Sequence, residues 1–388
     1  MFSKADLAPY RSTFPHLEQP HYYLNHAAFG VLSTRVNDAI NLHLNARSTG
    51  PIFTFPADHE VMESARQRIA QLINAPSPDN ISFVTNTSEG LNLIASGLNL
   101  GSGDRILLNT AEFPSNVYPF TNLERHGVGV DFIQSDKGFV TPDEISHALQ
   151  EQHKLVSVSA VQFLSGYRID LEKTGHIVRN NGSLFIVDAI QAIGNSPIDV
   201  QAMQIDGLVS GGLKWMMAPM GTGFVYISDK LRERIEQQYV GWLSVQTPWE
   251  LSNFDQGLNP TNRRYELGGL NIPGIYALNE SVVPFLELGS ERIRQHLVQL
   301  TDLIQERISS LGLVQFTVND PDRRTGIITF DLPEKIDGEQ LINTLAGHRV
   351  TISHRQGKIR FSPHYYNNSD DINAAMDIFM DVIHHNAL

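Results

Sequence analysis

The stretch "SGGLKWMMAPMGTGFVYI", residues 210–227, places a single lysine among glycines and apolar side chains. Lys214 follows two glycines and precedes Trp215, and a glycine-rich turn and an apolar run come after it. Lysine is rarely buried unless another group pairs with its charge. Taken alone, the stretch fits a loop lysine that extends its ammonium group to solvent. Whether Lys214 has a function therefore depends on what the rest of the chain brings near it.

Seven short apolar runs lie between residues 80 and 230 and alternate with helical or loop segments. They are ISFV (81–84), RILL (105–108), VGVDFI (128–133), LVSVSAV (155–161), SLFIVD (183–188), DGLVSG (206–211) and GFVYIS (223–228). Continuous apolar strands separated by helices predict an α/β fold with a mainly parallel sheet covered on both faces. Ligands of such sheets bind beyond the carboxyl ends of the strands, so functional residues are expected there.

The chain changes character after a passage rich in proline, asparagine and glycine at residues 256–274. A long helical segment is expected at about 275–311, because apolar residues recur three and four positions apart in 291–309. The remaining expected elements are three strands and a closing helix, at 327–332, 349–353, 358–362 and 370–385. This pattern predicts a second, smaller α/β unit.

Composition and charge exclude several classes of function. The 388 residues carry a formal net charge of −13, which argues against nucleic acid or an anionic membrane surface as a partner. No cysteine is present, which excludes disulfides and a thiol nucleophile, and the histidines show no metal-ligand spacing, so no metal is expected. The N-terminus lacks a secretory signal, and no stretch approaches the roughly 20 apolar residues that span a bilayer. We therefore expect a cytoplasmic protein.

Hydroxyl side chains mark the first of three candidate groups at strand ends. In FVTNTSEGLNLIA (83–95), a strand runs into the start of a helix that carries Thr87 and Ser88. Free backbone N–H groups, the helix dipole and two hydroxyls can together form a cradle for a phosphate group. Helix capping by Thr87 or Ser88 is the more common use of such residues, and the pattern leaves it open.

The second group closes the apolar strand of SLFIVDAIQAIG (183–194). Asp188 ends the strand and Gln191 follows three residues later. A buried carboxylate needs a partner, which favours a functional role. An aspartate that caps a following helix would show the same pattern.

The third group is Lys214, which one strand–helix–strand crossover separates from Asp188, so both are expected at neighbouring strand ends. A phosphate cradle, a carboxylate and a lysine at one edge are the parts that bind pyridoxal phosphate. The lysine forms a Schiff base with its aldehyde, the carboxylate keeps the ring nitrogen protonated, and the helix N-terminus takes the phosphate. Apolar neighbours would lower the pKa of Lys214, which favours Schiff-base formation. No GxGxxG opens a βαβ unit, which disfavours a nicotinamide-dependent dehydrogenase.

Seven motifs in a fixed order carry a family resemblance over nearly the whole chain. They are YYLNHAAFG (22–30), TNTSEG (85–90), EFPSNVYPF (112–120), IVDAIQAIG (186–194), LKWMMAPMGTGF (213–224), RYELGGLNIPGIYAL (264–278) and IRFSPHYYNNSDDI (359–372). In these motifs the chain resembles the class V aminotransferase family of fold-type-I pyridoxal-phosphate enzymes, which includes cysteine desulfurases, kynureninases and isopenicillin-N-epimerase-like proteins.

The resemblance implies a large, mainly parallel seven-stranded domain and a smaller α/β C-terminal domain. We expect an N-terminal segment at 1–25 that packs with the small domain, a large cofactor-binding domain at 26–270 and a small domain at 271–388. It also implies a homodimer with active sites at the interface. Gly268 and Gly269 would reach the partner's phosphate site, where desulfurases have Gly-Thr, so only backbone N–H groups would serve there.

For the cofactor, the resemblance implies a role for each residue already named. Lys214 would be the Schiff-base lysine and the proton carrier. Asp188 would pair with the ring nitrogen, and Gln191 would bind the ring hydroxyl. Thr87 and Ser88 would hold the phosphate. By the same resemblance Phe113 would stack on the ring, at a position where desulfurases have histidine and kynureninase-like members have phenylalanine.

For the substrate, the resemblance assigns Arg360 to the α-carboxylate, which suits the bidentate geometry of arginine. Gln162, Asn25 and His26 are expected as further carboxylate contacts, although His26 would also fit a loop histidine without a role. The substrate would then be a small molecule with a free α-carboxylate, either an amino acid or a small peptide-like acid.

The absence of cysteine excludes one enzyme class within the family that the chain resembles, because a persulfide-forming desulfurase needs a cysteine nucleophile. The Lys214–Trp215 pair and GWLSV (241–245) are more similar to the epimerase-like branch. We expect an aminotransferase-type reaction at Cα. The alternatives are a cysteine or cystine C–S lyase, an amino-acid epimerase, and a non-catalytic module that binds pyridoxal phosphate.

Overall fold

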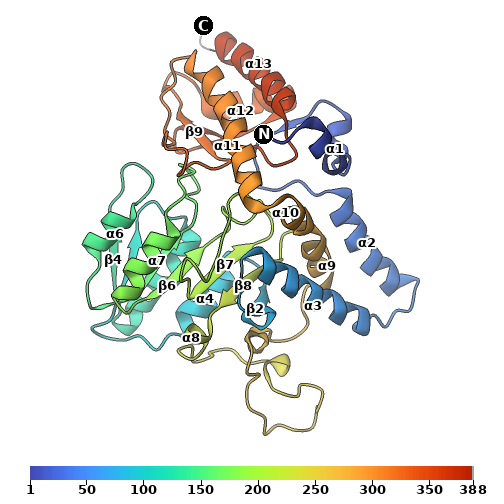
Figure 1. Ribbon diagram of the computed structural model, residues 1–388, viewed down its shortest axis with the longest axis vertical. Coiled ribbons are helices and arrows are strands. Elements are labelled where there is room, and N and C mark those ends of the chain that lie inside the picture. Colours follow the sequence, from blue (N-terminus) through green and yellow to red (C-terminus); the bar gives the residue numbers. More distant parts are fainter. Residues whose placement is uncertain (387–388) are drawn as a thin grey trace.

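The computed structural model describes the backbone of residues 1–386 and the side chains of residues 1–384, and a seven-stranded sheet lies at its centre (Figure 1). In sheet order the strands are β2 (Ile81–Val84), β8 (Gly223–Ile227), β7 (Gly207–Gly211), β6 (Leu184–Asp188), β5 (His153–Ser159), β3 (Arg105–Asn109) and β4 (Gly129–Ile133). Strand β8 is antiparallel to both of its neighbours, and the other neighbouring pairs are parallel. The predicted α/β fold with a mainly parallel seven-stranded sheet is confirmed.

Successive side chains of the strands enter two different hydrophobic cores. Along β6, Leu184 and Ile186 belong to one core, whereas Phe185 and Val187 belong to the other. Adjacent strand residues point to opposite faces, so both faces of this sheet are buried, as is usual for parallel strands. The helices of this part of the chain are α2 (Thr34–Ser48), α3 (Phe55–Leu72), α4 (Thr87–Gly97), α5 (Tyr118–Thr121), α6 (Pro142–Ala148), α7 (Leu171–Asn180) and α8 (Asp229–Arg232).

A smaller antiparallel sheet lies towards the C-terminus, in the strand order β11-β12-β9. Its strands and helices are β9 (Ile328–Asp331), β11 (Ser353–Arg355), β12 (Lys358–Phe361), α11 (Ser290–Ser309), α12 (Gly338–Gly347) and α13 (Ser369–Asn386). The N-terminal segment joins this unit, because β1 (Tyr22–Tyr23) pairs in parallel with β10 (Val350–Thr351) and α1 (Lys4–Arg11) lies beside it (Figure 1). The domain limits at 25 and 270 stay a prediction.

The single helix expected at 275–311 is wrong, because three helices occupy this part of the chain. They are α9 (Ile272–Ser281), α10 (Val283–Leu288) and α11. Pro284 lies in the first turn of α10, where it removes a backbone N–H donor, and Gly289 adopts a positive φ of 83° before α11 begins. Apolar periodicity continues across both breaks, so periodicity alone did not reveal them.

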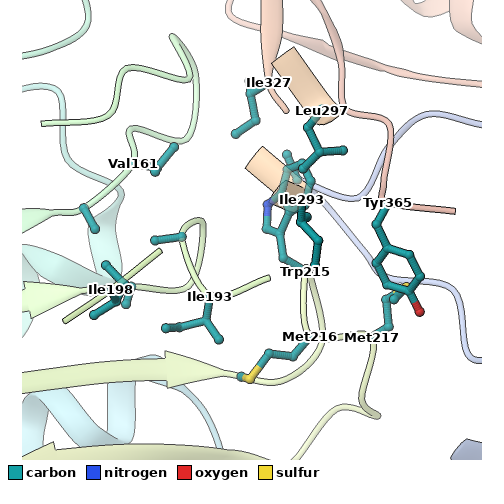
Figure 2. Close-up of a cluster of buried hydrophobic side chains, with 14 of the residues drawn as sticks. Val161, Ile193, Ile198, Trp215, Met216, Met217, Ile293, Leu297, Ile327 and Tyr365 are labelled. Carbon is teal, nitrogen blue, oxygen red and sulfur yellow. The ribbon is translucent and has the colours of Figure 1, made fainter. Parts of the chain in front are cut away.

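Short 3-10 helices complete the fold, and the core extends under the loop that carries Lys214. They are η1 (Pro15–Glu18), η2 (Pro78–Asn80), η3 (Pro114–Asn116), η4 (Asn122–His126), η5 (Trp242–Ser244) and η6 (Asn262–Tyr265). Figure 2 shows Trp215 beside Ile293 and Leu297 of α11, and Met216 points away from them, so this loop is buried in the core that the large sheet shares with the C-terminal unit. Among the helices of the described residues, none is long and apolar enough to cross a membrane.

Candidate active site

Backbone contacts hold the loop of Lys214 in one conformation. The Gly30 N–H donates to the Leu213 carbonyl oxygen (2.8 Å), and the Met217 N–H donates to that of Lys214 (3.0 Å). A Cβ on Gly30 would lie 2.2 Å from the Lys214 oxygen, so only glycine permits this approach. Met217 has a φ of 53°, a conformation that is costly for a residue with a side chain. The rigid loop fixes where the lysine side chain begins.

Trp215 enters the core and ties this loop to two other segments. Its Nε1 donates to Gln191 Oε1 (2.7 Å), and its carbonyl oxygen accepts from Nε2 of the buried His364 (2.7 Å). The His364 Nδ1 accepts from the Tyr365 N–H (2.7 Å), which places the ring proton on Nε2. Burial lowers the pKa of His364 to about 3, so this histidine is neutral and holds the loop. The Lys214 backbone is thereby anchored from the C-terminal unit as well.

The surroundings and the pKa of the Lys214 side chain differ from those of a lysine in solvent. Its Nζ lies 5.4 Å from the centroid of the Phe113 ring, and no described residue accepts a hydrogen bond from it. Burial lowers the pKa of Lys214 to about 8; the Asp188 charge opposes this shift, and the charges of Arg360 and Arg355 add to it. Near neutral pH the neutral, nucleophilic amine is therefore more populated in Lys214 than in a lysine in solvent.

Asp188 lies at the end of β6, which pairs directly with β7, so the predicted placement of Asp188 and Lys214 at neighbouring strand ends is confirmed. Asp188 is 2% exposed, and its carboxyl accepts from the Ile190 N–H (2.9 Å). Burial raises the pKa of Asp188 to about 7; the Ile190 N–H opposes this shift, Glu112 adds to it, and Lys214 opposes it.

The connection between β6 and β7 was predicted to contain a helix, and this is wrong. Turns alone lead from Asp188 to Gly207, and Gly194 has a positive φ of 92°. Gly194 and Pro197 lie where a helix would have to propagate, and both disfavour it. Asp188 therefore caps no helix, and the alternative structural role considered for it is absent.

The start of α4 lies at the same edge and presents unpaired backbone donors. Asn86 is the N-cap, because its side chain accepts from the Glu89 N–H (2.9 Å), so Thr87 and Ser88 are the first two helical residues and not caps. The N–H groups at these positions have no partner within a helix. Thr87 Oγ1 accepts from the Gly211 N–H (3.1 Å), and Ser88 Oγ donates to Ser115 Oγ (2.9 Å). The backbone N–H groups of Thr87 and Ser88 can therefore donate to an anion.

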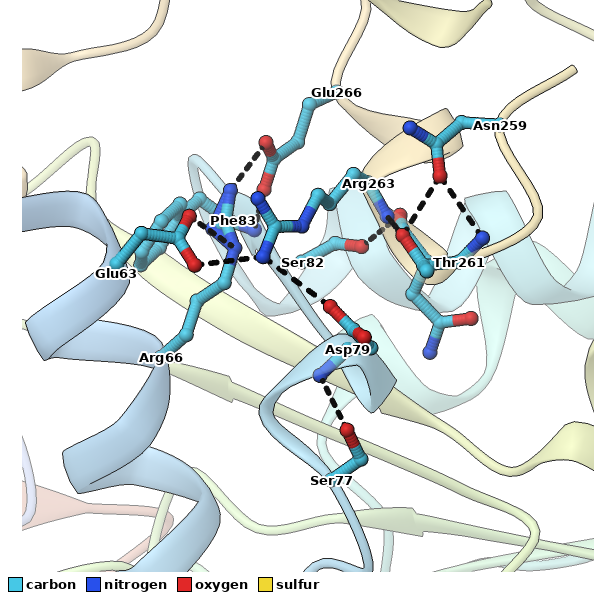
Figure 3. Close-up of polar contacts among 11 residues, drawn as sticks. Glu63, Arg66, Ser77, Asp79, Ser82, Phe83, Asn259, Thr261, Arg263 and Glu266 are labelled. Atoms are coloured by element: carbon cyan, nitrogen blue, oxygen red, sulfur yellow. Dashed lines mark hydrogen bonds and ion pairs between the residues drawn. The ribbon is translucent and has the colours of Figure 1, made fainter. Parts of the chain in front are cut away.

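Gly268 and Gly269 lie beside this helix start, where they line a cavity of about 180 Å³ together with Thr85 and Glu89. An ion-pair network just before them fixes this part of the chain (Figure 3). Glu266 accepts from Arg66 (2.6 Å) and from the Phe83 N–H (3.0 Å). Arg263 donates to Glu63 (2.6 Å) and Asp79 (3.2 Å). The two glycines therefore follow a rigid anchor.

Arg360 of β12 is a buried cation without a carboxylate partner among the described residues. It is 2% exposed, and its guanidinium donates to the Phe163 carbonyl oxygen and to Ser353 Oγ (3.2 Å). Burial lowers the pKa of Arg360 to about 9, and the charge of Arg355 adds to the shift. A buried guanidinium in this state favours an anionic ligand.

Two of the predicted site residues are amides whose buried oxygen has no hydrogen-bond partner among the described residues. They are Gln162 Oε1 and Asn25 Oδ1. Gln162 Nε2 donates to Glu112 Oε1 (3.0 Å), which fixes the orientation of its amide. A carboxylate contact from Gln162 would have to use the second N–H of Nε2, because Oε1 can only accept.

Both ring nitrogens of His26 are engaged within the protein. Nδ1 lies 3.1 Å from the Ser362 carbonyl oxygen, and Nε2 lies 3.1 Å from the Tyr366 hydroxyl. The ring is fully buried, and burial holds the pKa of His26 well below its usual value. These contacts leave no free ring nitrogen, and a substrate contact by His26 stays a prediction. Gln191 is similarly held, since Nε2 donates to the Ala27 carbonyl oxygen (2.9 Å) and only one N–H remains.

Glu112 was not singled out from the sequence, although it opens the motif EFPSNVYPF. It is a buried carboxylate (8% exposed) that immediately precedes Phe113, and its charge acts on Asp188. Its hydrogen-bond donors include Asn109 and Ser159, which are 50 positions apart. No local pattern links residues at that separation, so the sequence alone gave no signal for this group.

A family model described as aminotransferase class-V matches residues 23–374. A probable cysteine desulfurase of Methanothermobacter thermautotrophicus is 31% identical over 328 residues, which cover 80% of this chain and 81% of the relative. An uncharacterized aminotransferase of Schizosaccharomyces pombe is 26% identical over 88% of this chain and 86% of its own.

Among solved structures, the apo cysteine desulfurase of Thermococcus onnurineus matches with a TM-score of 0.88 and 22% identity over 99% of both chains. A complex of the cystine C–S lyase C-DES with its product cysteine persulfide matches with a TM-score of 0.86 and 22% identity, over 95% of this chain and 99% of that one. These structural matches share the fold with this chain.

Proposed function

The chain belongs to the class-V aminotransferase family of pyridoxal-phosphate-dependent enzymes, and on that premise we propose that Lys214 removes the α-proton of an amino acid whose carboxylate binds Arg360. The observation that carries the substrate class is the buried Arg360 guanidinium, which pairs with no carboxylate of the described chain. An α-carboxylate would supply the missing charge in bidentate geometry.

The residues at this edge fit pyridoxal phosphate. The start of α4 offers the N–H groups of Thr87 and Ser88 to a phosphate, and Asp188 is a buried acid that can share a proton with the ring nitrogen. Phe113 is 42% exposed beside Lys214, as a ring that stacks on a ligand would be. Gln191 keeps one N–H free for the ring hydroxyl.

When bound, pyridoxal phosphate supplies an aldehyde carbon for the lysine and a conjugated ring that delocalises negative charge from Cα. Lys214 would take the proton from Cα once the substrate amine has replaced it at that carbon, and its lowered pKa favours the neutral amine that this role needs. Phe113 has no titratable group, so it cannot move a proton at Cα, and we assign that role to Lys214. Asp188 keeps the ring nitrogen protonated, and Arg360 fixes the orientation of Cα.

We propose transamination as the outcome, with Lys214 returning the proton to a different carbon. A second candidate is C–S lysis of a sulfur amino acid. It is favoured by the desulfurase and C–S lyase relatives together with the absence of cysteine, since a route without a protein thiol remains open to such an enzyme. The epimerase alternative needs the same proton removal followed by return to the opposite face.

We further propose that the protein is a cytoplasmic homodimer in which Gly268 and Gly269 reach the partner's phosphate site. Support comes from exposed aromatic residues close to these glycines in the fold. Trp242 and Trp249 are 48% and 58% exposed, and their rings lie 5.2 Å apart. A Cβ on Gly268 would lie 3.4 Å from Trp242 Nε1, so the glycine and this apolar surface are contiguous.

The test is an absorbance spectrum of the purified protein with pyridoxal phosphate, before and after borohydride, followed by mass mapping. We expect a visible band that disappears on reduction and a reduced cofactor mass on the peptide of Lys214. A protein that stays colourless and takes up no cofactor would refute the proposal.

Substrate screening then separates the outcomes. Amino acids are added to the cofactor-loaded protein, with free keto acid, sulfide and loss of optical rotation as readouts. Keto acid that stops at one equivalent per site until an amino acceptor is added supports transamination. Sulfide and pyruvate from cysteine or cystine, without an acceptor, support the lyase instead.

A further inference from the structure

Glu112 gathers hydrogen bonds from three chain segments at the carboxyl edge of the large sheet. Its Oε1 accepts from Asn109 Nδ2 (2.7 Å), the Ser159 N–H (2.9 Å) and Gln162 Nε2 (3.0 Å). Its Oε2 accepts from Asn116 Nδ2 (2.9 Å) and the Ser159 hydroxyl. The ends of β3 and β5 and the last residue of η3 therefore meet at one carboxylate, directly before Phe113.

The partners of Glu112 are themselves oriented by other contacts. Asn116 Oδ1 accepts from the Ser157 hydroxyl (2.6 Å), and Asn109 Oδ1 accepts from the Ala111 N–H (3.1 Å). Each amide therefore turns its N–H towards Glu112. Amide and backbone N–H groups can only donate, so four of the five hydrogen bonds need Glu112 as the acceptor, which suits a carboxylate. Within the described part of the chain, no lysine or arginine forms an ion pair with it.

The charge of Glu112 therefore reaches the neighbouring site without being cancelled by a cation. Ser159 is the register partner of Asp188, and the Ala160 N–H donates to the Asp188 carbonyl oxygen (2.9 Å). Besides Glu112, the charged group that acts on Asp188 is Lys214. The groups that act on Lys214 are Asp188 and the arginines of the small sheet, Arg360 and Arg355.

We propose that Glu112 is a positioning residue of this site, which fixes Phe113 and Gln162 and supplies a second negative charge beside Asp188. This inference rests on the proposed function, because the groups that it positions are those assigned to cofactor and substrate. A second anion at this edge stabilises cationic forms of the ring nitrogen and of the lysine. The hydrogen bond to Glu112 sets which atom of Gln162 is available, and the anchored Glu112 fixes the backbone from which Phe113 extends.

The test compares Glu112→Gln with Glu112→Asp in the cofactor-loaded protein. Glutamine keeps the size of the side chain and removes its charge. The Ser159 hydroxyl can accept from one new N–H of the glutamine amide. The Asn116 amide can flip so that its oxygen accepts from the other N–H and its own N–H donates to the Ser157 hydroxyl. Glu112→Asp keeps the charge. Glu172→Gln, an exposed residue of α7, is the matched control.

The decisive readout is the pH midpoint of the visible absorbance band. Removing an anion disfavours the protonated, cationic form, so Glu112→Gln should lower this midpoint by roughly one pH unit, the scale on which a nearby charge acts. Glu112→Asp and Glu172→Gln should leave it near the wild-type value. The affinity for pyridoxal phosphate and the melting temperature of the apo protein are recorded alongside, and Glu112→Gln should lower the affinity several-fold.

A midpoint that Glu112→Gln leaves unchanged, with only a lower melting temperature, would overturn the inference and make Glu112 a structural residue. An equal shift in Glu112→Asp would do the same. Should Glu112→Gln not fold, the double variant E112Q/N116A is compared with N116A, which removes the conflicting donor from both. A wild-type protein that shows no visible band would instead refute the proposed function itself.

Discussion

Asp188 and Lys214 illustrate how one buried environment shifts an acid and a base towards each other. Burial raises the pKa of the Asp188 carboxyl to about 7 and lowers the pKa of the Lys214 ammonium to about 8. Each group has a charged form that the apolar surroundings disfavour. Both groups therefore have pKa values near neutral pH, where they can transfer protons, and their burial lowers the stability of the apo fold.

Asp188→Asn tests this cost through the pH dependence of stability in the apo protein. The folded carboxyl holds its proton up to about pH 7 and the unfolded one only up to 3.8, so the free energy of unfolding falls as pH rises between these values. Asparagine does not titrate, so the variant does not lose stability in this way. The melting temperature of the variant minus that of the wild type should therefore increase from pH 4.5 to pH 7.5. A difference that is equal at both pH values would contradict the assignment. With cofactor, activity should fall about 10²-fold or more, because the ring nitrogen loses its anion.

Arg360→Lys tests the binding of the substrate carboxylate. Lysine keeps the charge but cannot donate two parallel hydrogen bonds while also holding the Phe163 carbonyl oxygen. With the amino acid found by screening, KM should rise roughly ten- to hundredfold and kcat should change less. Arg355→Lys, at an exposed position of β11, is the control and should leave KM unchanged. A KM that both variants leave alone would argue against Arg360 as the carboxylate site.

At the scale of elements, helix α4 places its first two N–H groups through its cap. Asn86→Ala removes the acceptor for the Glu89 N–H and should cost about 1 kcal/mol of stability. Because the helix start then frays, the affinity for pyridoxal phosphate should fall more than that for pyridoxal, which lacks the phosphate. Ser33→Ala removes the corresponding cap of α2 and serves as the control for stability. Equal losses for both ligands would show that α4 does not hold the phosphate.

Elements with a strong local signal were predictable, and contacts between distant segments were not. The strands of the large sheet follow apolar runs, and Lys214, Asp188 and the start of α4 lie at strand ends because a parallel sheet brings its carboxyl ends to one edge. The breaks at Pro284 and Gly289 were hidden by continuing apolar periodicity. The Glu112 network was hidden because its donors come from distant strands, and only the folded sheet brings them together.

For the whole molecule, the chain between α8 and α9 extends away from the body of the large sheet (Figure 1). Its aromatic residues gather with the start of α3, and the Phe55 and Trp249 rings lie 4.8 Å apart. Leu251 and Phe254 of the same segment are 71% and 94% exposed. Monomeric proteins rarely expose apolar surface in such a group, whereas stable dimers bury about 800 Å² on each partner. We therefore expect a second copy of the chain to cover this apolar surface.

Trp249→Glu tests this dimer, because a charge at the centre of the aromatic group opposes burial. Sedimentation should give the wild type twice the mass of one chain and the variant the mass of a single chain. Val314→Glu places the same charge at a 66% exposed site of the C-terminal unit and should remain a dimer. If Gly268 and Gly269 complete the partner's phosphate site, the monomeric variant should also lose affinity for pyridoxal phosphate at least tenfold, while its affinity for pyridoxal falls less. A monomeric wild type that binds the cofactor tightly would show instead that each chain forms its site alone, and that the exposed aromatic residues serve another contact.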